Sequence, residues 1–132
     1  MHRPRILIVD DDPMIRDMLS RNLEDCQYEV QAVGDGDAFL QIAMQETPDL
    51  VLLDTSMPDC SSLDIARRLR MNPTTAGVPI IALTSFEPTN GGGAWQLNGH
   101  AEDIQVDDYA AKPFCPDLLL SKVREVLEQN SG

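Results

Sequence analysis

The stretch ILIVDDDP, residues 6–13, places four apolar residues directly before three carboxylates. An uninterrupted apolar run of this kind is typical of a β-strand buried on both faces, as in a parallel sheet. Asp12 followed by Pro13 predicts the N-cap and the first position of a helix. The spacing turns Leu19 and Leu23 of that helix inward and Arg16 outward. A strand that leads at once into a helix favours a fold in which the two alternate.

The same sequence pattern recurs along the chain. Strands are predicted over 6–9, 28–33, 50–54, 79–85 and 108–112, and helices from Pro13, over 38–46, from Ser61 or Ser62, and from Pro116. About five strand–helix units predict an α/β fold, a doubly wound parallel sheet with helices on both faces. We expect one domain over residues 1–132.

The segment 86–107 departs from this pattern because it contains Pro88 and three consecutive glycines. Only 94–104 has a composition suited to a helix, and Gly99 inside it would cost about 1 kcal/mol relative to Ala. We therefore expect a long loop followed by an irregular or shortened fourth helix.

The composition restricts the class of partner. With 22 acidic and 10 basic residues the net charge is −12, which opposes direct binding of nucleic acid or anionic membranes and suits a cation or a basic protein surface. The chain has no apolar stretch of roughly 18 residues and no signal-peptide pattern, so we expect a cytoplasmic protein. Three widely spaced cysteines predict neither a disulfide framework nor a zinc site.

Polar side chains stand at the carboxyl ends of four predicted strands: Asp10, Asp11, Asp54, Thr84 and Lys112. In a parallel sheet these ends meet at one edge, where doubly wound folds bind ligands. Crowded carboxylates disfavour one another's ionisation, and a hard divalent cation compensates them: Mg²⁺, with Mn²⁺ as an alternative. At such a site a phosphoryl group can approach a nucleophilic carboxylate. The Thr84 hydroxyl and the Lys112 ammonium would then contact the phosphoryl oxygens.

Four segments, in this order, resemble the receiver domain of two-component response regulators, the CheY-like superfamily: ILIVDDDP, DLVLLDTSMP (49–58), PIIALTS (79–85) and DYAAKPF (108–114). The resemblance covers nearly the whole chain and implies a flavodoxin-like (βα)5 sheet. It implies phosphoryl transfer from a histidine kinase or histidine phosphotransfer protein, and signalling to a downstream protein or an output domain. It does not imply an enzyme, since the only chemistry is self-phosphorylation and self-dephosphorylation.

The resemblance also implies roles for individual residues. Asp54 would be the phosphoacceptor, Asp11 would bind Mg²⁺ directly and Asp10 through water, and the backbone carbonyl of Ser56 would complete the protein ligands.

On the phosphoryl side, Thr84 and Lys112 would contact the transferred group, and Lys112-Pro113 would be a cis peptide. Tyr109 matches the aromatic switch position that acts together with Thr84.

Three features depart from the family pattern. The stretch 59–62, Asp-Cys-Ser-Ser, lacks the glycine usual in the turn there, and Cys115 replaces a stronger helix cap. Thr84 and Lys112 are 28 positions apart, several more than is usual, and the excess lies in the glycine-rich segment. That segment belongs to the face that rearranges and dimerises in the family, so the usual dimer does not follow from the resemblance.

Two other functions remain open from the residues. A small hydrolase of the haloacid dehalogenase type would use Asp10 as nucleophile with Asp12, although Pro13 and the short chain do not suit it. A degenerate receiver would act as a docking module without phosphorylation.

Overall fold

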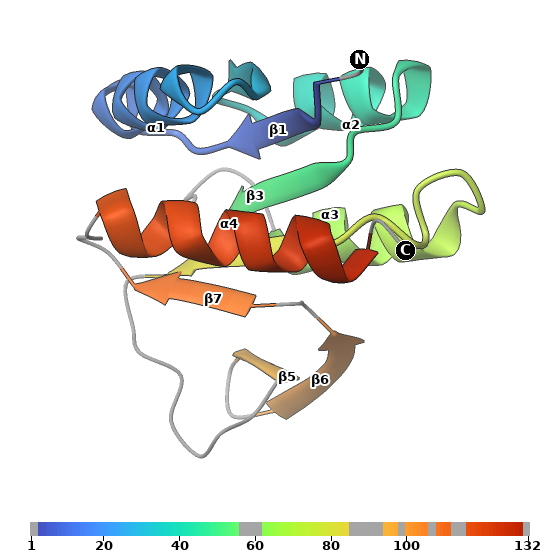
Figure 1. Ribbon diagram of the computed structural model, residues 1–132. Helices are drawn as coiled ribbons and strands as arrows, with labels where there is room; N and C mark the ends of the chain where they lie inside the picture. Colours follow the sequence, from blue (N-terminus) through green and yellow to red (C-terminus); the bar gives the residue numbers. More distant parts are fainter. Residues whose placement is uncertain are drawn as a thin grey trace.

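The computed structural model describes residues 3–55, 62–84, 94–97, 100–105, 108–111 and 116–130. A five-stranded parallel sheet runs through it in the order β2-β1-β3-β4-β7 (Figure 1). Its strands are β1 (Arg5–Val9), β2 (Glu29–Val33), β3 (Leu50–Asp54), β4 (Ile80–Thr84) and β7 (Asp108–Ala111). The helices are α1 (Pro13–Asp25), α2 (Gly36–Gln45), α3 (Ser62–Met71) and α4 (Pro116–Asn130). The doubly wound sheet with five strands is confirmed.

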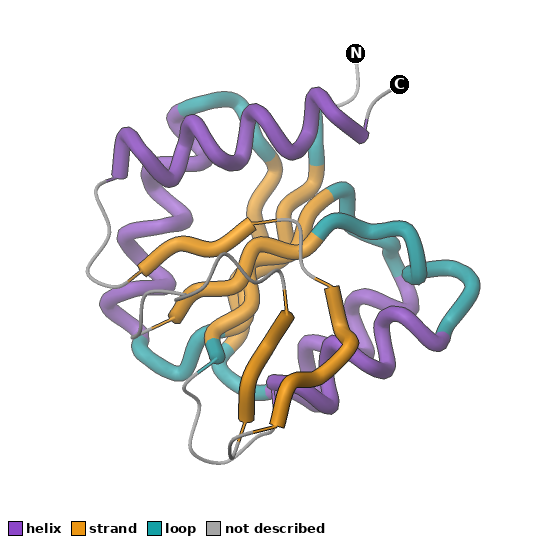
Figure 2. Tube along the Cα trace, turned by 90° about the horizontal axis from the view of Figure 1, so that it is seen from below, coloured by secondary structure: helices purple, strands orange, loops and turns teal. Residues whose placement is uncertain are grey.

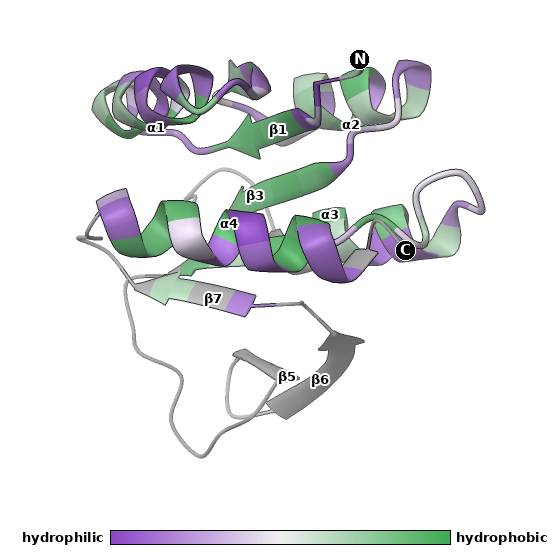
Figure 3. Cartoon of the chain, viewed as in Figure 1, coloured by the Kyte–Doolittle hydropathy of each residue, from purple (hydrophilic) through white to green (hydrophobic). Residues whose placement is uncertain are grey.

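The two faces of the sheet build two hydrophobic cores. Alternate strand residues point to opposite sides: Leu7 and Leu53 pack with α2 and α3, whereas Ile8 and Leu52 pack with α1 and α4. Figure 2 shows helices on both sides of the strands. Because β1 and β3 are covered on both faces, every β3 residue is buried, and both strands are largely hydrophobic in Figure 3.

The order of the strands reverses beside β1. This strand pairs in parallel with β2 along one edge and with β3 along the other. The chain therefore crosses back over β1 between β2 and β3. Such a reversal leaves a crevice outside the carboxyl ends of the two central strands, because the helices that follow them lie on opposite faces.

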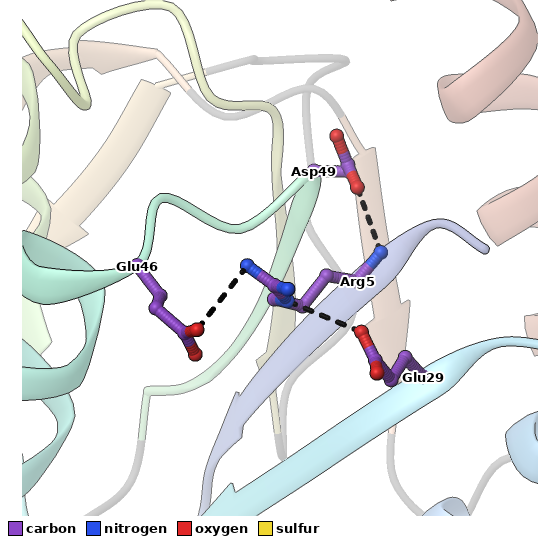
Figure 4. A network of polar contacts seen from close by, with 4 residues as sticks. All are labelled: Arg5, Glu29, Glu46 and Asp49. Carbon is purple, nitrogen blue, oxygen red and sulfur yellow. Dashed lines mark hydrogen bonds and ion pairs between the residues drawn. The ribbon is translucent and has the colours of Figure 1, made fainter. Parts of the chain in front are cut away.

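Arg5 connects several residues at the N-terminal ends of the strands, opposite the predicted site (Figure 4). Its backbone N–H donates to Asp49 Oδ2 at 2.7 Å, and the Asp49 N–H donates to the Arg5 carbonyl, also at 2.7 Å. Its guanidinium pairs with Glu29 at 3.2 Å and with Glu46 at 3.9 Å. These contacts join β1 to β2 and to the segment between α2 and β3, at the edge remote from the predicted site.

The expected helix within 94–104 is wrong. The structure has β5 (Ala94–Leu97) and β6 (His100–Gln105), which form a separate antiparallel two-stranded sheet. Leu97 pairs with His100, so two residues connect the strands. Those residues, Asn98 and Gly99, lie outside the described part of the chain, but Asn-Gly is the dipeptide most favoured in two-residue hairpins. The glycine that we counted against a helix is thus a hairpin signal.

Candidate phosphoryl-transfer site

Three carboxylates meet at the carboxyl edge of the sheet, as predicted. Asp10 directly follows β1 and Asp54 ends the adjacent strand β3, and both residues are fully buried. Asp11 is exposed. One carboxylate oxygen from each of the three lies within 4.8 Å of the others. The site therefore sits at the reversal of the strand order.

Asp10 is fixed by contacts through three of its groups. Its N–H donates to the Val33 carbonyl at 3.1 Å. Its Oδ1 accepts from the Asp12 N–H at 2.9 Å, and its carbonyl accepts from Arg16 Nη1 at 2.8 Å. The end of β2 and the start of α1 thus both hold the first acid of the site.

Asp12 caps α1, as its position before Pro13 predicted. It has extended backbone angles, and its Oδ1 accepts from the Met14 N–H at 2.9 Å. This carboxylate is occupied at the helix N-terminus, where a negative charge is favourable. The geometry therefore separates Asp12 from the group formed by Asp10, Asp11 and Asp54.

Arg16 lies nearer to the site than its predicted outward position implied. It is partly buried, and its guanidinium reaches back over the first turn of α1 to the Asp10 carbonyl. Helical side chains lean toward the helix N-terminus, and an arginine is long enough to span a turn. A basic residue five positions after Asp11, in the first turn of a helix, is the signal that the sequence offered.

The end of β4 lies beside Asp54. In the sheet register Asp54 pairs with Leu83, and the Thr55 N–H and hydroxyl both donate to the Leu83 carbonyl, at 2.9 and 3.2 Å. Thr84 pairs with Ala111, the residue before Lys112. The backbone thus brings the ends of β3, β4 and β7 to one edge, as the predicted constellation requires.

Several predicted features lie outside what the structure describes. These are Ser56, the turn at 59–61, Lys112, Pro113, Cys115, and the side chains of Thr84 and Tyr109. The roles given to them stay predictions.

The donor set suits a small hard cation. Mg²⁺ binds oxygen ligands at about 2.1 Å, so two directly bound oxygens are at most about 4.2 Å apart. Oxygens that all lie within 4.8 Å of one another are close enough to hold one such ion, directly or through water. Two of the three acids are buried, where neighbouring negative charges repel more strongly than in water. Asp10, Asp11 and Asp54 therefore fit Mg²⁺.

A family model for the response regulator receiver domain matches residues 6–124. The chain is a member of this family. Receiver domains bind Mg²⁺ at an acidic pocket, and Asp10, Asp11 and Asp54 form an acidic cluster here. They are signalling modules rather than conventional enzymes.

Among the described residues, no helix is long and apolar enough to span a membrane.

Two DNA-binding regulators are among the relatives of this receiver domain. It is 39% identical to the DNA-binding dual master transcriptional regulator RpaA of Synechocystis sp., over 96% of this chain and 50% of RpaA. It is 38% identical to the DNA-binding response regulator MtrA of Mycolicibacterium smegmatis, over 97% of this chain and 52% of MtrA. The receiver thus spans about half the length of these relatives.

Solved structures share its fold. A putative response regulator from Chloroflexus aurantiacus aligns with a TM-score of 0.82 and 30% identity, over 96% of this chain and 99% of that one. The receiver domain of the sensor histidine kinase PA1611 from Pseudomonas aeruginosa aligns at 0.81 and 25%, over 96% and 99%. That structure holds a magnesium ion in its active-site cleft.

Proposed function

We propose that this receiver accepts a phosphoryl group from a phosphohistidine onto Asp54, in a reaction that requires Mg²⁺. The observation that carries the proposal is the position of Asp54. Its carboxylate is fully buried at the end of a central strand, with oxygens of Asp10 and Asp11 within 4.8 Å. Acids that only solubilise a protein lie on its surface, whereas acids grouped at the strand reversal of a doubly wound sheet suit ligand chemistry.

In the proposed reaction an Asp54 oxygen attacks phosphorus as the bond from phosphorus to the donor imidazole nitrogen breaks. The products are an aspartyl phosphate and a histidine whose leaving nitrogen keeps the electron pair of the broken bond, on which it can take up a proton from water. Asp10, Asp11 and the Ser56 carbonyl would hold Mg²⁺, while Thr84 and Lys112 would contact the phosphoryl oxygens. The bound ion supplies positive charge that offsets repulsion between the carboxylates and the phosphoryl group.

The output of the switch would be a changed protein-binding surface on β4, β7 and the elements beside them. Thr84 ends β4, and Tyr109 pairs with Ala82 of the same strand. A movement of Thr84 toward a phosphoryl group on Asp54 would therefore reach β7 through neighbouring backbone. The partners would be a histidine kinase or histidine phosphotransfer protein upstream, and a target protein or an output domain downstream.

RpaA and MtrA are named as DNA-binding, and the receiver matches about half of each. We place any DNA contact of such a regulator outside the receiver, because a net charge of −12 repels the phosphate backbone.

The haloacid dehalogenase type of hydrolase fits the site less well than a receiver does. It pairs Asp10 with Asp12 as catalytic acids, yet Asp12 caps α1 and the family match is to receiver domains.

The test is to incubate the protein with a small phosphodonor and Mg²⁺ and to measure its intact mass. We expect one added phosphoryl group, localised to Asp54 by peptide mapping and lost in Asp54→Asn or in excess chelator. Asp17→Asn, which changes an exposed acid on α1, is the matched control and should label normally. Labelling that persists in Asp54→Asn would refute the assignment. A folded wild-type protein that neither labels nor binds beryllofluoride would instead be a docking module.

A further inference from the structure

Arg16 contacts the backbone of the acidic site without belonging to its ligand set. Its Nη1 donates to the carbonyl of Asp10 at 2.8 Å, in a partly buried position. That carbonyl belongs to the peptide unit that joins Asp10 to Asp11. Because a peptide unit is planar, fixing its oxygen also fixes the direction in which the chain enters Asp11.

Gly34, the residue after β2, provides the space for the guanidinium. A Cβ built on Gly34 would lie 2.6 Å from Nη1 of Arg16 and 3.2 Å from its Cζ. The guanidinium therefore packs against the Gly34 backbone in a place where a side chain would displace it. The neighbouring Val33 carbonyl accepts the Asp10 N–H at 3.1 Å, so Arg16 and the end of β2 together hold Asp10 from both sides of its backbone.

Asp10 and Asp11 differ in their burial and in the contacts that orient them. Asp10 is fully buried, and its Oδ1 accepts the Asp12 N–H. Asp11 is exposed, so packing does little to orient it. Its placement, with an oxygen within 4.8 Å of oxygens of Asp10 and Asp54, depends mainly on the peptide that precedes it.

We propose that Arg16 is a positioning residue that orients the Asp10–Asp11 peptide and thereby sets the affinity of the site for Mg²⁺. This inference rests on the proposed function, because it assigns the three carboxylates to a cation. The guanidinium holds the peptide oxygen by a charge-assisted hydrogen bond. This orienting effect must outweigh the repulsion between the guanidinium charge and the cation.

The direct test is calorimetric titration with Mg²⁺ alone, without any phosphodonor. Arg16→Ala should raise the dissociation constant about tenfold, the lower part of the range for groups that support metal ligands. Arg21→Ala is the matched control. It removes the same charge from the same helix, at an exposed residue that pairs with Asp17, and should change the constant by less than about twofold, as expected for an exposed, screened charge. Arg16→Lys keeps the charge without the planar fork and should bind with intermediate affinity.

A second variant displaces the guanidinium without altering it. Gly34→Ala meets the end of a flexible side chain, and the Gly34 backbone lies outside the left-handed region, so alanine is compatible with the fold. We expect it to weaken Mg²⁺ binding relative to Gly77→Ala, where a Cβ has no neighbour within 4 Å. In the Arg16→Ala background, Gly34→Ala should have no further effect, because the side chain it displaces is gone.

The two proposals fail separately. If Arg16→Ala binds Mg²⁺ as tightly as Arg21→Ala, the positioning role is wrong, even when wild-type protein is phosphorylated on Asp54. If Arg16→Ala does not fold, Gly34→Ala decides, and an affinity equal to that of Gly77→Ala overturns the inference. If wild-type protein binds Mg²⁺ but is not labelled on Asp54, the proposed function fails while the affinity comparison still tests Arg16. If wild-type protein does not bind Mg²⁺, both fail.

Discussion

Replacing Asp54 by asparagine should stabilise the folded domain when no divalent cation is present. Asp54 is fully buried, and oxygens of Asp10 and Asp11 lie within 4.8 Å of its own. Two unit negative charges 4.8 Å apart repel by about 3.5 kcal/mol at an effective dielectric constant of about 20. The exposed Asp11 contributes less, since water screens it. Asp54 has at least one further interaction that asparagine would not fully reproduce, so we expect a net gain of about 1–2 kcal/mol.

Mg²⁺ should reduce or remove this difference in stability. A ligand that binds only the folded state at ten times its dissociation constant adds about 1.4 kcal/mol to the free energy of unfolding. Wild-type protein should gain this amount, and Asp54→Asn should gain much less because it lacks one of the three carboxylates. The measurement is urea unfolding followed by far-ultraviolet circular dichroism, for both proteins, in chelator and in saturating Mg²⁺.

The control is Asp17→Asn, since Asp17 is an exposed acid paired with Arg21 on the surface of α1. It should shift stability by less than about 0.5 kcal/mol and leave the response to Mg²⁺ intact. A lower stability of Asp54→Asn than of wild type in chelator would contradict the proposed repulsion. An equal gain of stability from Mg²⁺ in both proteins would contradict a role of Asp54 in binding the cation.

Four further outcomes can be checked by unfolding or titration. Asp12→Ala should cost about 1 kcal/mol in urea unfolding, because it removes the cap of α1. Phe39→Ala empties a fully buried position and should cost about 3–5 kcal/mol in the same assay. Asp49→Ala leaves the Arg5 N–H without its acceptor and should cost about 1–2 kcal/mol. Burial raises the pKa of Tyr28 above its usual 10.0, so its folded state favours the neutral phenol. Stability should therefore fall as pH rises from 10.0 through the folded pKa, and Tyr28→Phe should lose less stability over that range in unfolding measured at several pH values.

The alternation of strands and helices was predictable because burial on both faces leaves a plain signal in the sequence. The run LVLL, residues 50–53, has no polar position that could face water, and β3 contains these residues. The start of α1 was predictable for a local reason, since Asp12 and Pro13 act within one turn. The grouping of Asp10, Asp11 and Asp54 followed from the parallel sheet alone, because its strands end at one edge.

The hairpin of β5 and β6 was missed for a different reason. The composition of 94–104 suits a helix moderately, and Gly99 entered only as a penalty within that helix. Asn98-Gly99 between two short strands is a stronger signal, but it appears only when the segment is tested as a hairpin. The position of Arg16 could not be read from periodicity, which places Cα atoms on a helix face and does not show where a long side chain ends.

The arrangement of the site predicts that a cost in stability and the proposed function fall on the same residues. At the reversal of the strand order, backbone geometry brings the ends of β1 and β3 together whatever side chains they carry. Apolar residues there would extend the two cores, whereas Asp10 and Asp54 place buried negative charge beside one another. In the proposed reaction a bound cation would offset this repulsion, and the phosphoryl group would meet a carboxylate that is already held at the end of a strand. Substitutions that relieve the repulsion without a cation should therefore stabilise the domain and weaken its response to phosphodonors together.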